Sequence, residues 1–131
     1  MVVDITPPLP EQRQLIQSYG DNGFCIAGVN YSGSVLIEAE KTHFWPIDIP
    51  AAITLESLFP ITQSIRAKLS GGIVMLLGTG SRPAIVDSGL RLELQDLGIG
   101  LEVMNTGAAC RTFNVLLAEE RSVIAALIAV A

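Results

Sequence analysis

The C-terminal half of the chain alternates apolar runs with stretches of helical periodicity, and this order limits the fold more than any other feature. The run Ile73–Leu77 lies between Gly71-Gly72 and Gly78-Thr79-Gly80. An apolar run of this length bounded by glycines is typical of a strand buried on both faces of a sheet. Residues 99–104 and 123–130 are predicted as two further strands of the same sheet.

Two helices are predicted between these strands. The first covers residues 88–97 and is followed by Gly98, which suits a left-handed helix end. The leucines of its buried face are Leu90, Leu94 and Leu97. The second has Asn105 or Thr106 as its N-cap and extends to about Ala118. The order strand, helix, strand, helix, strand is a βαβαβ unit, whose right-handed crossovers place helices on the sheet faces.

The N-terminal half is predicted to be rich in short strands. They are expected at residues 15–19, 23–28, 34–38 and 42–45. Asn30-Tyr31-Ser32-Gly33 is a turn signal, which predicts a hairpin between two of these strands. Thr54 is expected to cap a short helix that Pro60 interrupts, and a further helical turn or two is expected within residues 61–69.

These elements predict an α/β fold: a three-layer single domain with a central mixed sheet, a β-rich N-terminal half and a βαβαβ C-terminal half. Residues 1–13 are expected to form an extended proline-rich arm, and residues 14–131 the domain. A length of 131 residues suits one domain. The side chains expected to be nearly fully buried in the central strands are Ile73, Met75, Val103 and Leu127.

Composition and charge exclude several classes of function. Half of the residues are hydrophobic and 16% are charged, which excludes disorder for most of the chain. The net charge of −5 and the scattered arginines argue against nucleic-acid binding. The longest apolar run, Val123–Ala131, is far shorter than the roughly 20 residues of a membrane-spanning helix. So few charges leave apolar surface, which predicts association with itself or with a protein partner.

The start of the chain gives an expectation for its location. It has no basic region followed by a long apolar stretch, so no secretory or mitochondrial leader is expected. Cys25 and Cys110 are therefore expected to be free thiols in a reducing compartment, the cytoplasm.

A candidate site is predicted beyond the C-terminal ends of the strands, where sheets of this type bind ligands. The residues of this anion or nucleotide pocket are Gly78, Thr79, Gly80, Arg82, Asn105, Thr106, Cys110 and Arg111. Arg111 is expected to reach toward the loop 78–82 or toward an acidic neighbour and, with Arg82, to make this edge positive. The dinucleotide pattern G-x-G-x-x-G is incomplete because Pro83 stands at its third glycine, so a tight turn is the favoured interpretation.

The helix that starts near residue 106 raises two further expectations. The Thr106 hydroxyl is expected to cap it by accepting from the amide of Ala108 or Ala109. Cys110 is the one candidate nucleophile, because a helix N-terminus lowers a thiol pKa. The favoured interpretation is that Cys110 is a small buried apolar residue.

No catalytic residues, metal or cofactor are predicted. A general base for Cys110 is missing, since the single histidine, His43, lies in the other half of the chain. One histidine and two distant cysteines are too few for a metal site. His43 is expected to be a strand residue with one nitrogen hydrogen-bonded.

Several segments together resemble a known family. They are Leu77-Gly78-Thr79-Gly80, the run from Leu97 to Met104, the run from Thr106 to Leu116, Arg121-Ser122-Val123 and Phe44-Trp45-Pro46. The chain is similar over about residues 14–130 to mitochondrial respiratory complex I assembly factor 3 and its bacterial and archaeal relatives of unknown function. The family pattern has Glu-Gly-Arg where this chain has Glu119-Glu120-Arg121. A glycine at the middle position eases a left-handed turn.

The resemblance implies a three-layer α/β fold with a central mixed sheet and no established enzyme activity. It also implies, from the mitochondrial member, a role in assembling an electron-transport complex through protein contacts. The first functional hypothesis is therefore a non-enzymatic protein-interaction domain, an assembly factor for a membrane-bound respiratory complex. The alternative is a small-ligand binder or enzyme that uses the pocket at residues 78–82 and 105–111. Convergent polar groups in a deep pocket would favour this alternative.

Overall fold

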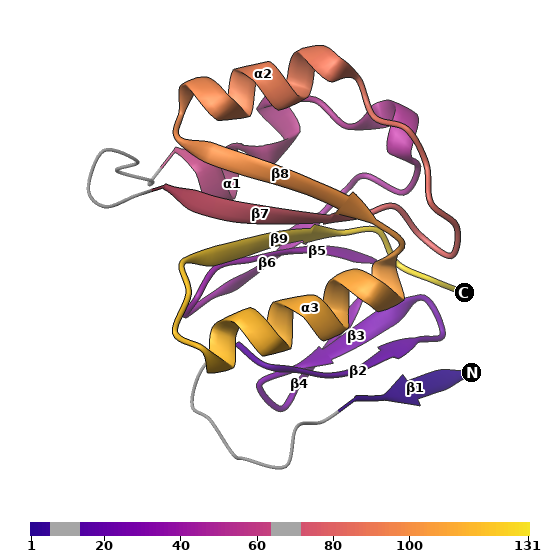
Figure 1. Cartoon of the computed structure of the whole chain (residues 1–131). Helices are drawn as coiled ribbons and strands as arrows, with labels where there is room; N and C mark the ends of the chain where they lie inside the picture. Colours follow the sequence, from indigo (N-terminus) through magenta and orange to yellow (C-terminus); the bar gives the residue numbers. More distant parts are fainter. Residues whose placement is uncertain (6–13, 64–71) are drawn as a thin grey trace.

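The computed structural model describes residues 1–5, 14–63 and 72–131 (Figure 1). Its larger sheet has the strand order β6-β5-β9-β7-β8. These strands are β5 (Ser34–Ile37), β6 (Thr42–Trp45), β7 (Ile73–Gly78), β8 (Ile99–Met104) and β9 (Val123–Leu127). β7 runs parallel to β8 and β9, whereas β5 is antiparallel to β6 and β9. The sheet is therefore mixed, as the sequence predicts.

The predicted βαβαβ unit is confirmed. α2 (Ser88–Asp96) connects β7 to β8, and α3 (Thr106–Ala118) connects β8 back across β7 to β9. Because the two crossovers run in opposite directions along the sheet and share one hand, they place α2 and α3 on opposite faces (Figure 1). The C-terminal ends of β7, β8 and β9 consequently meet at one edge, where the sequence places the candidate site.

A second, antiparallel sheet has the order β1-β2-β3-β4. Its strands are β1 (Val2–Asp4), β2 (Ile16–Gly20), β3 (Gly23–Ile26) and β4 (Val29–Ser32). β1 shows that the start of the predicted arm joins a sheet, while its prolines, Pro7 to Pro10, lie outside the described residues.

The predicted turn at residues 30–33 is wrong, because Asn30 to Ser32 belong to β4. The hairpin instead links β3 to β4 through Ala27 and Gly28, whose φ angles are 50° and 82°. Two consecutive positive φ angles are the conformation of a type I′ turn, which matches the twist of the flanking strands. β5, the predicted partner of β3, belongs to the larger sheet.

Two hydrophobic cores separate three layers. One lies between the larger sheet and α2, together with the short helical segments Pro50–Ala52, Glu56–Leu58 and α1 (Phe59–Thr62). The other lies between the opposite face of the larger sheet, α3 and the inner face of the four-stranded sheet (Figure 1). The α/β fold with a central mixed sheet is therefore as predicted.

Burial follows the predicted pattern with three exceptions. Met75 and Leu127 are fully buried, but Ile73 and Val103 are only partly so. Ile73 starts β7 at the end of the sheet, and Val103 lies on the edge strand β8. Leu97 remains 39% exposed because it is the C-cap residue of α2 rather than part of its inner face.

Pro60 does not interrupt a helix, because it lies in the first turn of α1. A proline is tolerated there, since the first amides of a helix have no partner within it. Thr54 does cap locally: its hydroxyl accepts from the Ser57 amide at 3.1 Å. Residues 64–69 of the predicted helical segment lie outside the described residues.

The end of α3 explains why a glycine would suit position 120. The Arg121 amide bonds to the Leu116 carbonyl and the Glu120 amide to the Leu117 carbonyl, which is the Schellman pattern. Glu120 has a φ of 59°, in the left-handed region that favours glycine.

We expect the free energy of unfolding of the Glu120→Gly variant to be about 1 kcal/mol higher than that of the Glu120→Ala variant, because only glycine adopts this φ without strain. Both substitutions remove the same carboxylate, so their difference isolates the backbone effect. Urea denaturation monitored through Trp45 fluorescence measures it. Equal stabilities would mean that the turn is not strained.

Candidate functional site

Thr106 is the centre of the predicted site, and it is completely buried. Its amide donates to the Gly80 carbonyl at 2.8 Å. Its hydroxyl accepts from the Gly80 amide at 2.9 Å and donates to the Ile128 carbonyl at 2.7 Å. One side chain therefore ties together the segments that follow β7, β8 and β9.

The loop after β7 is fitted closely around this residue. A Cβ atom at Gly78 would lie 2.8 Å from the Thr106 hydroxyl oxygen and 2.9 Å from its Cα atom, so only glycine allows the approach. The Thr79 amide donates to the Met104 carbonyl at 2.9 Å, and its hydroxyl donates to the Arg82 carbonyl at 2.7 Å. The glycines and Thr79 thus form the tight turn that the sequence favours over a dinucleotide loop.

Asn105, and not Thr106, is the N-cap of α3. Its side-chain oxygen accepts from the Ala108 amide at 2.8 Å. The expected bond from the Thr106 hydroxyl is wrong, because that hydroxyl is used by Gly80 and Ile128. The amides of Ala108 and Ala109 are both bonded to Asn105, so neither is directed at a ligand.

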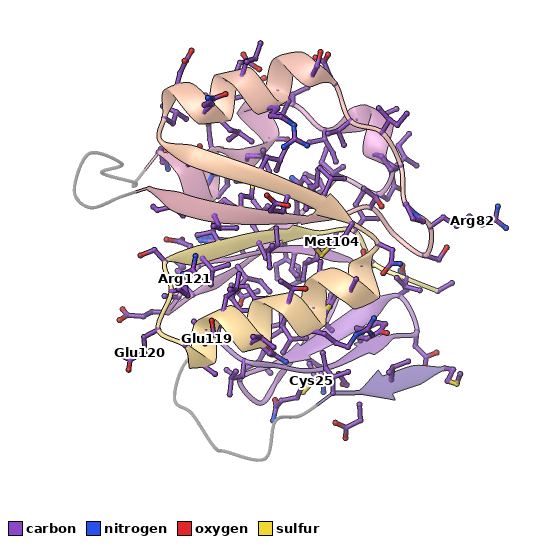
Figure 2. The ribbon with its side chains drawn as sticks, in the orientation of Figure 1. Cys25, Arg82, Met104, Glu119, Glu120 and Arg121 are labelled. Atoms are coloured by element: carbon purple, nitrogen blue, oxygen red, sulfur yellow. The ribbon has the colours of Figure 1, made fainter. Side chains whose placement is uncertain are left out.

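The two arginines of the predicted site do not converge. Arg82 is exposed and its side chain extends away from the molecule (Figure 2). The Arg111 guanidinium lies 3.4 Å from the Tyr19 hydroxyl, toward the four-stranded sheet. The expectation that Arg111 reaches the loop 78–82 is therefore wrong, and the two side chains do not form a joint positive pocket.

Cys110 is fully buried in the core between the larger sheet and the four-stranded sheet. Desolvation raises its pKa to about 12, and the positive charge of Arg111 opposes this only in part. A thiol with a raised pKa is a poor nucleophile near neutral pH. The geometry thus gives Cys110 the role of a small core residue.

We expect one cysteine of the native protein to react with a thiol reagent and the other to react only after unfolding. Cys25 is half-buried and its thiol donates to Gln17, whereas Cys110 has no exposed surface. Labelling near neutral pH followed by peptide mass mapping, with and without urea, measures both reactions. Rapid native labelling of Cys110 would contradict the structural role.

His43 has one nitrogen bonded, as expected, since Nε2 lies 2.6 Å from a carboxylate oxygen of Glu38. Within residues 1–5, 14–63 and 72–131, no three His, Cys, Asp or Glu side chains lie together as a metal site requires. None of the helices in the same ranges has the length and apolar character needed to cross a membrane.

Sequence reasoning missed two surface features. The loop after β7 exposes Ile85 almost completely, at 98%. The open edge of β8 borders a cavity of about 490 Å³ that Arg91 and Gln95 of α2 also line. The glycines at positions 98 and 100, on either side of Ile99, are the one sequence signal of this groove, because neither places a side chain in it.

Solved structures of bacterial proteins share this architecture over nearly their whole length. A Bartonella henselae protein described as an outer membrane protein is 34% identical, with a TM-score of 0.80, covering 91% of this chain and 97% of its own. A Bordetella parapertussis protein is 32% identical, with a TM-score of 0.76 and coverages of 93% and 99%. A Bordetella pertussis protein described as a Mth938-like domain is 27% identical, with a TM-score of 0.74 and coverages of 97% and 92%.

No curated protein matches the chain. Residues 16–128 match the family described as protein of unknown function DUF498/DUF598. This match takes in every strand from β2 to β9 and both long helices. The chain therefore belongs to the DUF498/DUF598 family.

Proposed function

We propose that the chain is a protein-interaction domain that serves in assembling a membrane-bound respiratory complex from the cytoplasmic side. The resemblance to complex I assembly factor 3 supports the assembly role. The free thiols of Cys25 and Cys110 suit a reducing compartment. The observation that carries the interaction role is the exposed loop between β7 and α2.

This loop presents an apolar side chain on a braced backbone. Ile85 is 98% exposed, and Arg82 projects into solvent on the same loop (Figure 2). The Thr79 hydroxyl holds the Arg82 carbonyl, Pro83 restricts the backbone, and Val86 packs against the core below. A braced loop loses little conformational freedom on binding, so its contacts contribute more fully to affinity.

The chemistry of the loop indicates what it would contact. An isoleucine can insert into an apolar pocket, and the Arg82 guanidinium on the same loop can pair with a carboxylate at the rim of that pocket. A partner protein with an apolar pocket and an acidic rim satisfies both groups. The ligand-binding alternative has less support, because the polar groups of its pocket already have partners within the chain. The Thr106 hydroxyl bonds to Gly80 and Ile128, and the Asn105 side-chain oxygen accepts from Ala108.

Affinity purification of the full chain from its native host tests the proposal. Proteins that copurify with the wild type are expected to be lost from Ile85→Ser and reduced for Arg82→Glu. Leu92→Ser is the matched control, since Leu92 is 62% exposed on α2 and lies outside the loop. All three sites are exposed, so circular dichroism should show unchanged folds.

Two outcomes would overturn the proposed role of the loop. One is capture of the same proteins by Ile85→Ser and by the wild type. The other is equal loss with Leu92→Ser, which would mean that any exposed apolar side chain has the same effect. If the proteins that no longer copurify with Ile85→Ser include a subunit of a respiratory complex, the assembly role is supported. If they include none, the assembly role is contradicted, while the interaction role of the loop stands.

A further inference from the structure

The edge of β8 carries main-chain groups that point away from the larger sheet. Among the described residues, β8 is the last strand in the order β6-β5-β9-β7-β8. The carbonyls of Gly98 and Met104 accept hydrogen bonds from the β7 side, at 3.0 and 2.9 Å. Alternate residues of a strand in a parallel pair direct their main-chain groups to opposite sides. The residues that direct theirs to the open edge are therefore Ile99, Leu101 and Val103.

Arg91 shows that this edge accepts hydrogen bonds. Its guanidinium donates to the Leu101 carbonyl from the neighbouring α2. The cavity of about 490 Å³ between α2 and β8 leaves space beside the strand. An open edge with a groove along it is the kind of surface to which another strand adds.

Gly100 is the second residue of β8, and no contact within the described residues requires a glycine there. Its φ is outside the left-handed region, and a Cβ atom there would have its nearest neighbour, the Ile73 carbonyl oxygen, at 3.9 Å. Alanine would therefore fit. Glycine weakens a strand, and in such positions it often marks a place where another backbone comes close.

We infer that a second copy of the chain pairs its β8 antiparallel to this edge, so that two larger sheets join into one. Only the register centred on Leu101 uses all three outward-facing residues. Leu101 then faces Leu101 of the partner subunit, and Ile99 faces Val103 of the partner subunit. This inference goes beyond the proposed function, because the loop with Ile85 takes no part in it.

The same register places Glu102 of the partner subunit opposite Gly100. The two form a non-hydrogen-bonded pair, in which side chains across an antiparallel ladder are closest. Because Gly100 has no side chain, its position leaves room for the Glu102 side chain of the partner subunit.

Arg121 supplies a charge that complements this carboxylate. Arg121 is exposed and lines, with Gly100 and the neighbouring Glu120, a cavity of about 460 Å³ at the N-terminal ends of β7 to β9 (Figure 2). Gly100 and Val123 both pair with Val74, so they share one face of the sheet. A two-fold axis through Leu101 brings each Glu102 toward the cavity lined by the other subunit's arginine.

Charge reversal of the full chain, measured by sedimentation velocity over a range of protein concentrations, tests the inference. The wild type is expected to form dimers as concentration rises. Glu102→Lys and Arg121→Glu are each expected to weaken dimerisation by about tenfold, the effect of losing one favourable charge contact on each side of the axis. The double variant is expected to regain wild-type dimerisation, because the charges are exchanged.

A second variant tests the hydrogen-bond edge. Arg91→Gln is expected to strengthen dimerisation, because it frees the Leu101 carbonyl and removes two positive charges that would meet near the axis. Ile85→Ser should leave dimerisation unchanged, so failure of the loop proposal and failure of this one are distinguishable.

Amide hydrogen exchange shows where the subunits meet. The amides of Ile99, Leu101 and Val103 are expected to exchange more slowly as concentration rises, while that of Gly100, bonded toward β7, stays constant. A chain that remains monomeric at all concentrations would overturn the inference. So would a dimer that leaves these three amides unprotected, or a double variant that does not recover.

Discussion

The free energy of unfolding of the Thr106→Val variant is expected to be about 2–4 kcal/mol lower than that of the wild type. Valine keeps the shape of threonine but removes the hydroxyl that serves the Gly80 amide and the Ile128 carbonyl. Each buried group left without a partner costs about 1–3 kcal/mol. Few single surface or cap changes in this chain should have an effect of this size, because Thr106 joins the ends of three strands.

Urea denaturation of two further variants separates the hydroxyl from other contributions. Thr106→Ser keeps the hydroxyl and loses one methyl group, so it is expected to cost about 1 kcal/mol. Asn105→Ala removes the N-cap bond to Ala108 and is also expected to cost about 1 kcal/mol. If valine and serine at position 106 cost the same, the hydroxyl is not what holds the three segments together.

The C-terminal half could be predicted because its local signals agree with its tertiary structure. β7 is apolar and bounded by glycines, and α2 carries Leu90 and Leu94 at the spacing of one buried face. The rule of right-handed crossovers then places the helices without further information. The exceptions have two causes: Ile73 is the first residue of β7, at the end of the sheet, and Val103 lies on the outermost strand β8. A local pattern predicts neither the exact strand end nor the strand order.

The N-terminal half was harder to predict because its turns do not follow the strongest local signal. Ala27 has a φ of 50°, a conformation that alanine rarely adopts, so no residue preference marks that turn. By contrast, the turn between β2 and β3 does follow residue preference, since Asp21 and Asn22, with φ of 50° and 61°, are residue types that tolerate the left-handed region. Asn30, Tyr31 and Ser32, which have a turn-like composition, instead belong to β4, where pairing with β3 outweighs local preference.

The candidate site could be placed but its role could not be predicted. Sequence reasoning brings the loop after β7 and the start of α3 to one edge, and the structure joins them through Gly80 and Thr106. What the residues alone do not reveal is that the carbonyl of Ile128, directly after β9, accepts a hydrogen bond from the Thr106 hydroxyl. That contact depends on β9 lying beside β7, and it turns the polar groups of the edge inward.

The stability of the protein is expected to fall steeply in alkali because of Cys110. Burial raises the pKa of this thiol from 9.0 to about 12. Between these values the unfolded chain releases the proton while the folded chain retains it. Stability is therefore fully present below about pH 9 and decreases as pH rises toward 12, by at most about 1.4 kcal/mol per pH unit.

Comparison with Cys110→Ala isolates this effect, because tyrosines and lysines titrate equally in both proteins. Between about pH 8 and about pH 10.5 the wild type should lose about 2 kcal/mol more than the variant, measured by urea denaturation under reducing conditions. The variant itself starts lower, since removing a buried sulfur leaves a small cavity. Parallel pH profiles would mean that the thiol ionises in the folded protein. Cys110 would then be accessible to water, and the reactive-cysteine hypothesis would regain its basis.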